Sequence, residues 1–405
     1  MIRSGIDIEE VNRFSSMTNI DKFLRRVFTT KEIEYFDKNN SHRFESIAAH
    51  YCAKEAVSKF FGTGVRGFSL KDIEVKHDAL GKPYVMFKNM KINASLSLSH
   101  TKTAACAIVI GDDMENYISE YLKYSEYSHL LPKRADDANK GDCGRVFIVA
   151  GSVGLTGAAC LAAMGSLRMG SGLVTVGTPK TVQTVVSTKL TEAMTVPLEE
   201  NNGIISKLAI PKILEFLKKS DVCIFGMGIG KSPDFLEILK AMLSENIPLL
   251  IDADGINALS ENIDILKNKK CKVVLTPHPG EMSRLTGLEV AEIQQNREKI
   301  ASDFASEYDV VLLLKGSDTV IASPSGAMHI NKTGNSGMAS GGMGDVLSGI
   351  IGSCIGQNMS VYNSAVFGAF IHGLAGDFAA KEYGKLSMIA TDLIENLPHA
   401  LRFFE

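Results

Sequence analysis

The C-terminal two-thirds of the chain alternates short apolar runs with helical patterns, and this alternation restricts the fold more than any other feature. The apolar runs include RVFIVAG at 145–151, DVCIFG at 221–226 and VVLLLKG at 310–316. Short apolar strands separated by helices are typical of βαβ units, which form a parallel sheet. We therefore predict an α/β domain with a mostly parallel sheet and helices on both of its faces.

Four loops follow strands of this predicted sheet. They read FGMGIG at 225–230, IDADGIN at 251–257, TPHPGE at 276–281 and LKGSDT at 314–319. In an open parallel sheet, ligands bind beyond the carboxyl ends of the strands. The four loops are therefore predicted to converge on one edge of the sheet and to form a binding site there.

A glycine-rich stretch, NSGMASGGMGDVLSGIIG at 335–352, is a candidate phosphate cradle. Glycines lack Cβ atoms and let backbone N–H groups approach an anion, and the positive end of the following helix adds to the attraction. Asp345 stands where that helix begins, so it is placed to take a proton from a hydroxyl that attacks phosphorus. The alternative is a loop that only permits tight packing, with Asp345 as an ordinary N-cap. The convergence of the four loops favours a site.

The positions of five other polar residues in the pattern of strands and helices indicate their roles. His278 lies in a proline-flanked loop, which favours a ligand role over a simple loop contact. Lys315 emerges at a strand end, where a cation can meet phosphate. Asp252 and Asp254 fit either a metal site or a helix cap, and the sequence does not decide between them. His372 lies inside an apolar helical pattern and is predicted to be a buried, hydrogen-bonded residue and not a catalyst.

Residues 1–115 follow another pattern, which predicts an α+β domain with a largely antiparallel sheet. Asp7 lies on the first predicted strand, and Glu55 and Lys59 share a face of a predicted helix. Carboxylates from a strand and a helix can surround Mg²⁺, with water and substrate phosphates completing its octahedron. From spacing alone, however, a solvated Glu55–Lys59 pair is the more common arrangement.

Motifs in this segment occur in the order and spacing of one known family. They are GIDIEEVNRF at 5–14, FLRRVFTTKE at 23–32, AKEAVSKFFGTG at 53–64, GKPYV at 81–85 and SLSHTKTAACAIVI at 97–110. The segment resembles holo-[acyl-carrier-protein] synthase, a phosphopantetheinyl transferase. The resemblance implies transfer of 4′-phosphopantetheine from coenzyme A to a serine of apo-acyl-carrier protein.

The same resemblance implies roles for individual residues. Asp7 and Glu55 match residues that bind Mg²⁺ and the pyrophosphate of coenzyme A, while Lys59 and His100 match residues near coenzyme A. Glu55, or a water on the metal beside it, would take the serine proton. His50 stands where the family usually has arginine, so a titratable side chain replaces a permanent cation.

The family also implies partners for residues 1–115. Arg13, Arg25 and Arg26 match a basic surface that receives the acidic carrier protein. The family is trimeric, so a homo-oligomer is expected. The competing hypothesis is a non-catalytic oligomerisation or docking module, and the intact set of implied site residues argues against it.

A second resemblance covers nearly all of residues 125–405. Its motifs are the four strand-end loops and glycine-rich stretch named above, together with KGDCGRVFIVAGS at 140–152, GLTGAACL at 154–161 and FIHGLAGD at 370–377. They resemble the ADP- or ATP-dependent NAD(P)H-hydrate dehydratases, which are ribokinase-like enzymes. The resemblance implies that the hydrated cofactor meets Ala158, Gly230, His278 and Asp345, and that the adenine nucleotide meets Lys315, Gly316, Ser317, Asp318, Thr319 and Gly344. Met227 stands where the family commonly has proline.

The chemistry implied by this resemblance is repair of (6S)-NAD(P)H hydrate. Asp345 would deprotonate the C6 hydroxyl, whose oxygen attacks the terminal phosphoryl group of ADP. Loss of phosphate then restores NADH or NADPH and leaves AMP. Mg²⁺ is expected to screen the phosphates. The alternative function is a vitamin or sugar-alcohol kinase, because ribokinase-like folds accept many substrates.

We accordingly divide the chain into a transferase-like domain at 1–115, a helical connection at 116–134 and a dehydratase-like domain at 135–405. The net charge of −3 gives no electrostatic reason to expect a nucleic-acid partner. No apolar run reaches the length of a membrane span, and no signal sequence is apparent, so a cytoplasmic protein is expected. The seven scattered cysteines are predicted to be reduced core residues.

Overall fold

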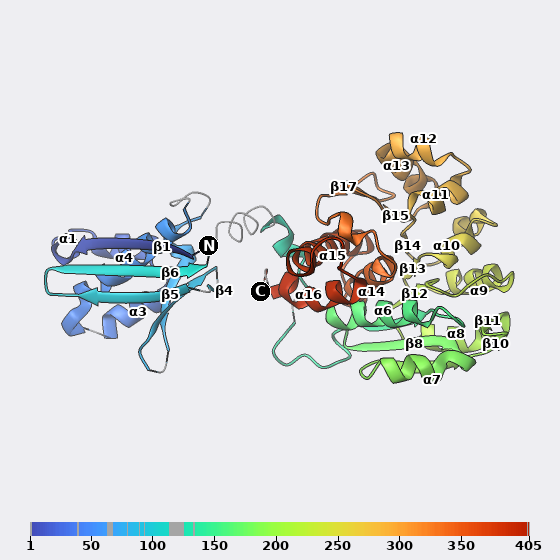
Figure 1. Ribbon diagram of the computed structural model, residues 1–405, viewed down its shortest axis with the longest axis horizontal. Coiled ribbons are helices and arrows are strands. Elements are labelled where there is room, and N and C mark those ends of the chain that lie inside the picture. Colours follow the sequence, from blue (N-terminus) through green and yellow to red (C-terminus); the bar gives the residue numbers. More distant parts are fainter. Residues whose placement is uncertain are drawn as a thin grey trace. The chain divides into compact units, whose positions relative to one another are not determined.

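The computed structural model describes residues 2–38, 40–62, 68–78, 80–88, 90–92, 94–112, 125–132, 134–402 and 404. The chain divides into two compact units, the first reaching Ser128 and the second covering His129–Phe404. Figure 1 shows both units and labels their elements. Most of the predicted helical connection at 116–134 lies outside the described residues; within it, Ser125–Leu130 forms the 3-10 helix η3.

The N-terminal unit contains two small antiparallel sheets and a set of helices. In the first sheet β6 (Ala104–Asp112) lies between β1 (Ile2–Glu10) and β5 (Ala94–His100). The second sheet has the order β2 (Ile73–His77), β3 (Pro83–Phe87), β4 (Met90–Lys91). The helices are α1 (Val11–Ser15), α2 (Ile20–Val27), α3 (Thr30–Lys38), η1 (Asn40–His42), α4 (Arg43–Phe60) and η2 (Leu70–Asp72).

Helix α4 is the centre of this unit and packs against β1 and β6. β1 passes so close to the helix that a Cβ atom on Gly5 would lie 2.0 Å from the carbonyl oxygen of Ala56. Only glycine permits this approach, because any other side chain would collide with backbone. Figure 1 shows the opposite face of the sheet turned toward the viewer. Ile6 and Ile8 alternate with Gly5 along β1 and so lie on that face, where they are 63% and 71% exposed.

A buried ion pair ties several elements of the unit together. The Lys54 ammonium donates to Glu32 Oε2 at 2.9 Å and to the carbonyl oxygens of Leu70 and Ile73, and both charged side chains are buried. Glu32 Oε1 in turn accepts from the backbone N–H of Val75 at 3.1 Å. Burial lowers the pKa of Lys54, against the opposing effect of Glu32. The pair therefore joins α3, α4, η2 and β2.

We expect Lys54→Met to destabilise the N-terminal unit by about 3–5 kcal/mol, because it leaves Glu32 buried without its cation. Urea titration followed by hydrogen exchange of the α4 amides would measure the loss in this unit alone. Lys71→Met is the matched control, since Lys71 is exposed and donates to the carbonyl oxygen of Arg25 at 3.3 Å. Equal stability of the two variants would contradict the expectation.

The C-terminal unit is built on one nine-stranded sheet. Its order is β17 (Met328–Asn331), β16 (Thr319–Ala322), β15 (Val311–Leu314), β14 (Val273–Leu275), β13 (Leu249–Ile251), β12 (Val222–Phe225), β7 (Arg145–Val149), β8 (Leu173–Pro179), β9 (Met194–Leu198). Strands from β15 to β9 are parallel, and β16 and β17 are antiparallel additions at one edge. The prediction of a mostly parallel sheet is confirmed.

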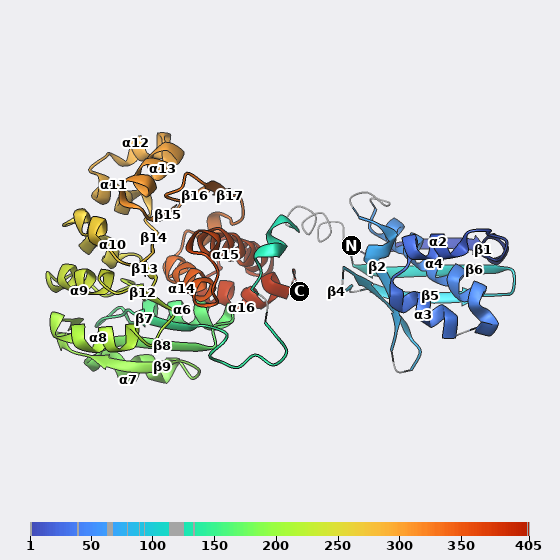
Figure 2. The same ribbon diagram turned by 180° about the vertical axis from the view of Figure 1, so that it is seen from behind.

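The helices of this unit pack against buried strands. They are α6 (Thr156–Arg168), α7 (Lys180–Lys189), α8 (Ile210–Leu217), α9 (Asp234–Leu243), α10 (Asp254–Leu259), α11 (Pro279–Thr286), α12 (Val290–Gln295), α13 (Arg297–Tyr308), α14 (Met343–Gly356), α15 (Val361–Tyr383) and α16 (Ala390–Arg402). Short 3-10 helices are η4 (Lys207–Ala209), η5 (Ile263–Asn268) and η6 (Ser336–Met338), and β10 (Glu200–Asn201) pairs with β11 (Ile204–Ile205). Figure 2 shows the same elements from behind.

Alternate side chains of the central strands meet different helices. A Cβ atom on Gly352 of α14 would lie 2.3 Å from Ile224, which places α14 directly on one face of β12. Phe225 instead belongs to a buried cluster with Phe235 of α9 and Ile213 of α8. β12 is therefore covered on both faces, which explains why all four of its residues are apolar and buried.

The strand order brings the predicted loops together. β12, β13, β14 and β15 are consecutive neighbours in the sheet and run in the same direction, so the loops that follow them lie along one edge. The loop after β12 touches the loop after β13, since a Cβ atom on Gly226 would lie 2.1 Å from the Asp252 carbonyl oxygen. No helix of the described residues is long and apolar enough to cross a membrane. All seven cysteines have free thiols, and all except the partly exposed Cys106 are buried, so the prediction of reduced core residues is confirmed for six of them.

Candidate active sites

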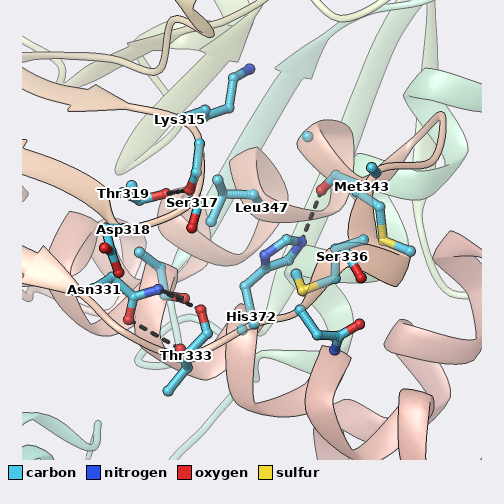
Figure 3. Close-up of a pocket in the computed structure, with 18 of the residues that line it drawn as sticks. Lys315, Ser317, Asp318, Thr319, Asn331, Thr333, Ser336, Met343, Leu347 and His372 are labelled. Carbon is cyan, nitrogen blue, oxygen red and sulfur yellow. Dashed lines mark hydrogen bonds between the residues drawn. The ribbon is translucent and has the colours of Figure 1, made fainter. Parts of the chain in front are cut away.

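A pocket of about 630 Å³ opens at this edge of the C-terminal sheet (Figure 3). Its walls come from the end of β15, from the segment between β17 and α14, and from α15. Every residue predicted to meet the nucleotide lines it, namely Lys315, Gly316, Ser317, Asp318, Thr319 and Gly344. His278 lines the same pocket.

The first wall is the loop after β15, which Arg297 of α13 holds in place. The Arg297 guanidinium donates to the carbonyl oxygens of Leu314 and Lys315, at 2.8 and 3.3 Å. It also lies 2.9 Å from the position that a Cβ atom on Gly316 would occupy. Gly316 and Asp318 both have positive φ, of 152° and 55°. The loop thus has an unusual backbone course that the half-buried guanidinium of Arg297 supports.

The opposite wall is tied to α15. Asn335 donates to Asp377 at 2.9 Å, and the backbone N–H of Gly334 donates to the same carboxylate at 3.0 Å. His372 points from α15 toward Met343 and donates through Nε2 to its carbonyl oxygen at 2.9 Å (Figure 3). Burial lowers the pKa of His372 to about 4. The prediction of a buried, hydrogen-bonded histidine is confirmed.

Helix α14 starts at the pocket, and Asp345 is in its first turn. The N-cap is Gly342, with φ of 90°, and it makes no side-chain capping bond. The alternative reading of Asp345 as an N-cap is therefore wrong. The first turn of a helix has backbone N–H groups without helical partners, and these attract anions.

Asp345 belongs to a cluster of charged groups that come from two helices, α11 and α14, and from the loops after β13 and β15. Lys315 pairs with Asp252 at 2.8 Å and lies 3.8 Å from Glu281, and Ser348 donates to Asp252 at 2.7 Å. Burial and the Asp252 carboxylate raise the pKa of Asp345 to about 7, although the Lys315 ammonium opposes the rise. A carboxylate with this pKa is suited to general-base catalysis at neutral pH.

The two aspartates left open by the sequence have different partners. Asp252 is an ion-pair partner of Lys315 and not a helix cap. Asp254 begins α10 and accepts from the backbone N–H of Gly230 at 2.9 Å. Between them Ala253 has φ of 51°, a strained conformation for a residue with a side chain. Among the described residues, no group of three histidines, cysteines or carboxylates could hold a metal.

Three of the four residues implied for the hydrated cofactor, Ala158, Gly230 and Asp345, lie outside the lining of the pocket. Ala158 of α6 approaches Gly228, where a Cβ atom would lie 2.9 Å from that of Ala158. Gly230 follows in the same loop and has φ of 84°. The structure thus groups Ala158 and Gly230 around the loop after β12, and Asp254 connects them to the loop after β13.

His278 is the N-cap of α11, a role that the sequence reading did not assign. Its Nδ1 accepts from the backbone N–H groups of Gly280 and Glu281, at 3.0 and 3.3 Å, and its Nε2 lies 3.4 Å from Glu281. The backbone N–H of His278 donates to Glu281 at 2.8 Å, which completes a capping box. The imidazole is nevertheless half exposed and lines the pocket. His278 can therefore cap α11 and also contact a ligand.

Three residues of the site were not predicted from the sequence. Glu281 could have been predicted, because a carboxylate three residues after a cap indicates a capping box. Ser348 could also have been predicted, since it lies three residues after Asp345 on the same face of a helix. Arg297 could not, because it is far in sequence from the loop that it supports.

In the N-terminal unit, Asp7, Lys59 and Glu55 are brought together. Lys59 donates to Asp7 Oδ1 at 2.7 Å and to the carbonyl oxygen of Ile6 at 3.1 Å. The hydrogen bond to Asp7 and the charges of Asp7 and Glu55 raise the pKa of Lys59. Asp7 Oδ2 is buried and has no hydrogen-bond partner among the described residues. A buried carboxylate oxygen of this kind, near a second carboxylate, fits a divalent cation.

His100 lies elsewhere in the N-terminal unit. It lines a pocket of about 450 Å³ together with Tyr35, His50, His77 and the Gly81–Pro83 turn. Asp7, Glu55 and Lys59 are absent from its lining. Within this unit, the four residues of the implied transferase site therefore form two groups.

Comparison with known proteins gives two family matches. Residues 146–399 match the model of the NAD(P)H-hydrate dehydratase family, and residues 3–112 match that of the 4′-phosphopantetheinyl transferase superfamily.

Individual relatives align with the C-terminal unit. The bifunctional NAD(P)H-hydrate repair enzyme Nnr of Moorella thermoacetica is 46% identical over 277 residues, which are 68% of this chain and 52% of that protein. The ADP-dependent (S)-NAD(P)H-hydrate dehydratase of Neisseria meningitidis is 33% identical over 264 residues, covering 64% of this chain and 84% of its own. The chain thus spans about half the length of the bifunctional relative.

A solved structure supports the same assignment of the fold. The crystal structure of the ADP/ATP-dependent NAD(P)H-hydrate dehydratase of Bacillus subtilis, co-crystallised with ATP and Mg²⁺, has 28% sequence identity and a TM-score of 0.60. It covers 69% of this chain and 97% of the Bacillus protein. The C-terminal unit therefore has a ribokinase-like fold.

Proposed function

Because the chain belongs to the NAD(P)H-hydrate dehydratase family, we propose that residues 135–405 convert (6S)-NAD(P)H hydrate to NAD(P)H with ADP or ATP. We also propose that residues 1–115 transfer 4′-phosphopantetheine from coenzyme A to apo-acyl-carrier protein. The observation that carries the first proposal is Asp345, which has a raised pKa, lies in the first turn of a helix and directly follows Gly344, a residue of the pocket lining.

In the repair reaction, each step has a residue suited to it. The Asp345 carboxylate takes the proton of the C6 hydroxyl, and the oxygen attacks the terminal phosphoryl group of the nucleotide. Lys315 and the backbone N–H groups at the start of α14 stabilise the charge on the phosphoryl oxygens. The ring nitrogen then expels phosphate, which gives NAD(P)H with AMP when ADP is the donor.

The positions of the other residues favour a two-part site. Ser317, Asp318, Thr319 and Gly344 line the pocket and would hold the nucleotide. Gly230 belongs to the neighbouring loop after β12 and Ala158 packs against Gly228 of that loop, so both would meet the hydrate. His278 lines the pocket from α11.

In the transferase reaction, Glu55 would take the proton of the carrier serine, and Lys59 would meet coenzyme A phosphates once it leaves Asp7. Asp7 and Glu55 would hold Mg²⁺, which neutralises phosphate charge when bound. His100 would meet another part of coenzyme A, because it lies in the separate pocket of this unit. The carrier protein would dock on Arg13, Arg25 and Arg26, which are exposed.

We further propose that the N-terminal unit forms a homo-oligomer, as the family resemblance implies. The exposed Ile6 and Ile8 on the open face of the β1–β6–β5 sheet support this, because a second copy packed on that face would bury them.

Two assays test the proposed function. Chemically hydrated NADH supplied with ADP or ATP should regain the absorbance of NADH, and apo-carrier protein incubated with coenzyme A and Mg²⁺ should gain the mass of phosphopantetheine. A chain that phosphorylates a vitamin alcohol and repairs no hydrate would instead establish the kinase alternative.

We expect the repair rate to rise with pH around neutrality. Asp345 accepts a proton only when ionised, and its pKa of about 7 means that ionisation is incomplete below that pH. kcat/KM should therefore fall by about tenfold per pH unit well below pH 7 and level off above about pH 8. Initial rates, corrected for the reaction without protein, would show this, and a profile that is flat down to about pH 5 would contradict it.

A further inference from the structure

Arg297 is the first residue of α13 and holds the backbone of the loop after β15, although it is absent from the lining of the pocket. Its Nη2 donates to the carbonyl oxygens of Leu314 and Lys315, at 2.8 and 3.3 Å. Its Nη1 donates to Oε1 of Gln294 at 2.9 Å. Because the guanidinium is planar and its N–H groups have fixed directions, these contacts hold two consecutive carbonyl oxygens in place.

The two carbonyl groups that Arg297 holds set the directions of the N–H groups that follow them. In a planar trans peptide, the C=O and N–H bonds point in opposite directions. The Leu314 carbonyl points to Arg297, so the Lys315 N–H points the other way. There it donates to the carbonyl oxygen of Pro277 at 2.8 Å. By the same geometry, the N–H of Gly316 points away from Arg297.

The loop then presents two N–H groups that the protein does not use. Thr319 Oγ1 donates to the carbonyl oxygen of Gly316 at 2.9 Å, which turns the N–H of Ser317 away from Thr319. In the described part of the chain, the N–H groups of Gly316 and Ser317 have no hydrogen-bond partner. Because both residues line the pocket, these N–H groups are available as donors to a ligand there.

The guanidinium group suits this supporting position better than a simple ammonium would. A Cβ atom on Gly316 would lie 2.9 Å from Nη1 of Arg297, so the group packs directly against the loop. Burial lowers the pKa of Arg297 and the Asp318 carboxylate opposes the fall, and an arginine keeps its charge at neutral pH in either case. Lysine would bring one point charge and could not hold both carbonyl oxygens with the same fork geometry.

We propose that Arg297 is a positioning residue for the nucleotide donor. By holding the carbonyl oxygens of the loop after β15, it keeps the N–H groups of Gly316 and Ser317 directed toward the nucleotide in the pocket. It acts through the loop and contacts neither the nucleotide nor the hydrate. The inference rests on the proposed function, since it concerns the nucleotide of the repair reaction.

Binding of ADP to the whole chain tests this role. Arg297→Ala should weaken ADP binding about tenfold or more, because the hydrogen bonds from a charged group to the loop are lost. KM for ADP should rise with it, while kcat at saturating nucleotide should change little, because Lys315 keeps its ion pair with Asp252. Lys299→Met is the matched control, since Lys299 lies on the same helix with an exposed side chain and should leave ADP binding unchanged.

Two small cations separate the geometry of the guanidinium from its charge. Methylguanidinium has the planar fork and should restore much of the ADP affinity of Arg297→Ala, whereas methylammonium has the charge alone and should not. Arg297→Lys keeps the cation and most of the stem, and it should also bind ADP more weakly than the wild type. This second variant decides the question if Arg297→Ala does not fold.

Unchanged ADP affinity in Arg297→Ala or in Arg297→Lys would overturn the inference. Equal restoration by the two cations would also overturn it, because charge alone would then explain the effect. So would a loss of kcat at unchanged ADP affinity. If the wild-type chain binds ADP but repairs no hydrate, the proposed function fails, and the ADP affinities of the variants still decide the role of Arg297.

Discussion

Replacing Asp345 with asparagine should lower the turnover of hydrate repair by about 10²-fold or more, which is the usual contribution of a positioned base. Asparagine keeps the size of the side chain but cannot accept the proton of the C6 hydroxyl. Nucleotide binding should survive, because the pocket is lined by other residues, including Lys315 and Thr319. Recovery of NADH absorbance measures turnover, and titration with ADP measures binding.

The matched control is Asp303→Asn. Asp303 is exposed on α13 and pairs with Lys299, one helical turn away, so its charge lies at the surface. This variant should repair the hydrate at the wild-type rate. If Asp345→Asn did the same, the base would have to be another residue, and Asp252 would be the next candidate to test.

The second large effect is expected from Glu55→Gln, which should abolish phosphopantetheine transfer and leave hydrate repair intact. Glutamine can neither take the serine proton nor balance the charge of a divalent cation. The two activities separate because Glu55 and Asp345 belong to different compact units. The mass of apo-carrier protein after incubation with coenzyme A and Mg²⁺ gives the first activity, and NADH recovery gives the second.

Glu45→Gln is the control for this variant, since Glu45 lies in the first turn of the same helix and only approaches His42 at 3.7 Å. An undiminished mass gain by Glu55→Gln would remove Glu55 from the proposed mechanism. A loss of both activities would indicate that the substitution affects more than the transferase site.

The features that could be predicted from the sequence depend on residues that are close together along the chain. Apolar runs predicted the parallel sheet, and because parallel strands end at one edge, the residues from Lys315 to Thr319 could be placed at a site before their geometry was known. Asp345 could be proposed as a base because glycines and a helix start adjoin it. The roles of these residues in catalysis stay predictions.

The features that could not be predicted depend on partners distant in sequence. Lys315 was expected to be available to phosphate, but it pairs with Asp252, which follows a strand two places away in the sheet. The support of the same loop by Arg297 comes from a helix that no motif marks. In the N-terminal unit, spacing could not show that His100 and Asp7 line different parts of the surface.

The position of Lys315 has a consequence for the pH dependence of the repair reaction. Lys315 lines the pocket, and its ammonium lowers the pKa of Asp345. A phosphate entering the pocket brings negative charge close to both groups and so offsets the influence of Lys315 on the carboxylate. Asp345 would then hold a proton more strongly with nucleotide present than without it. The carboxylate would then be a stronger base that is ionised only at higher pH, so saturating nucleotide should move the rise of the repair rate to higher pH.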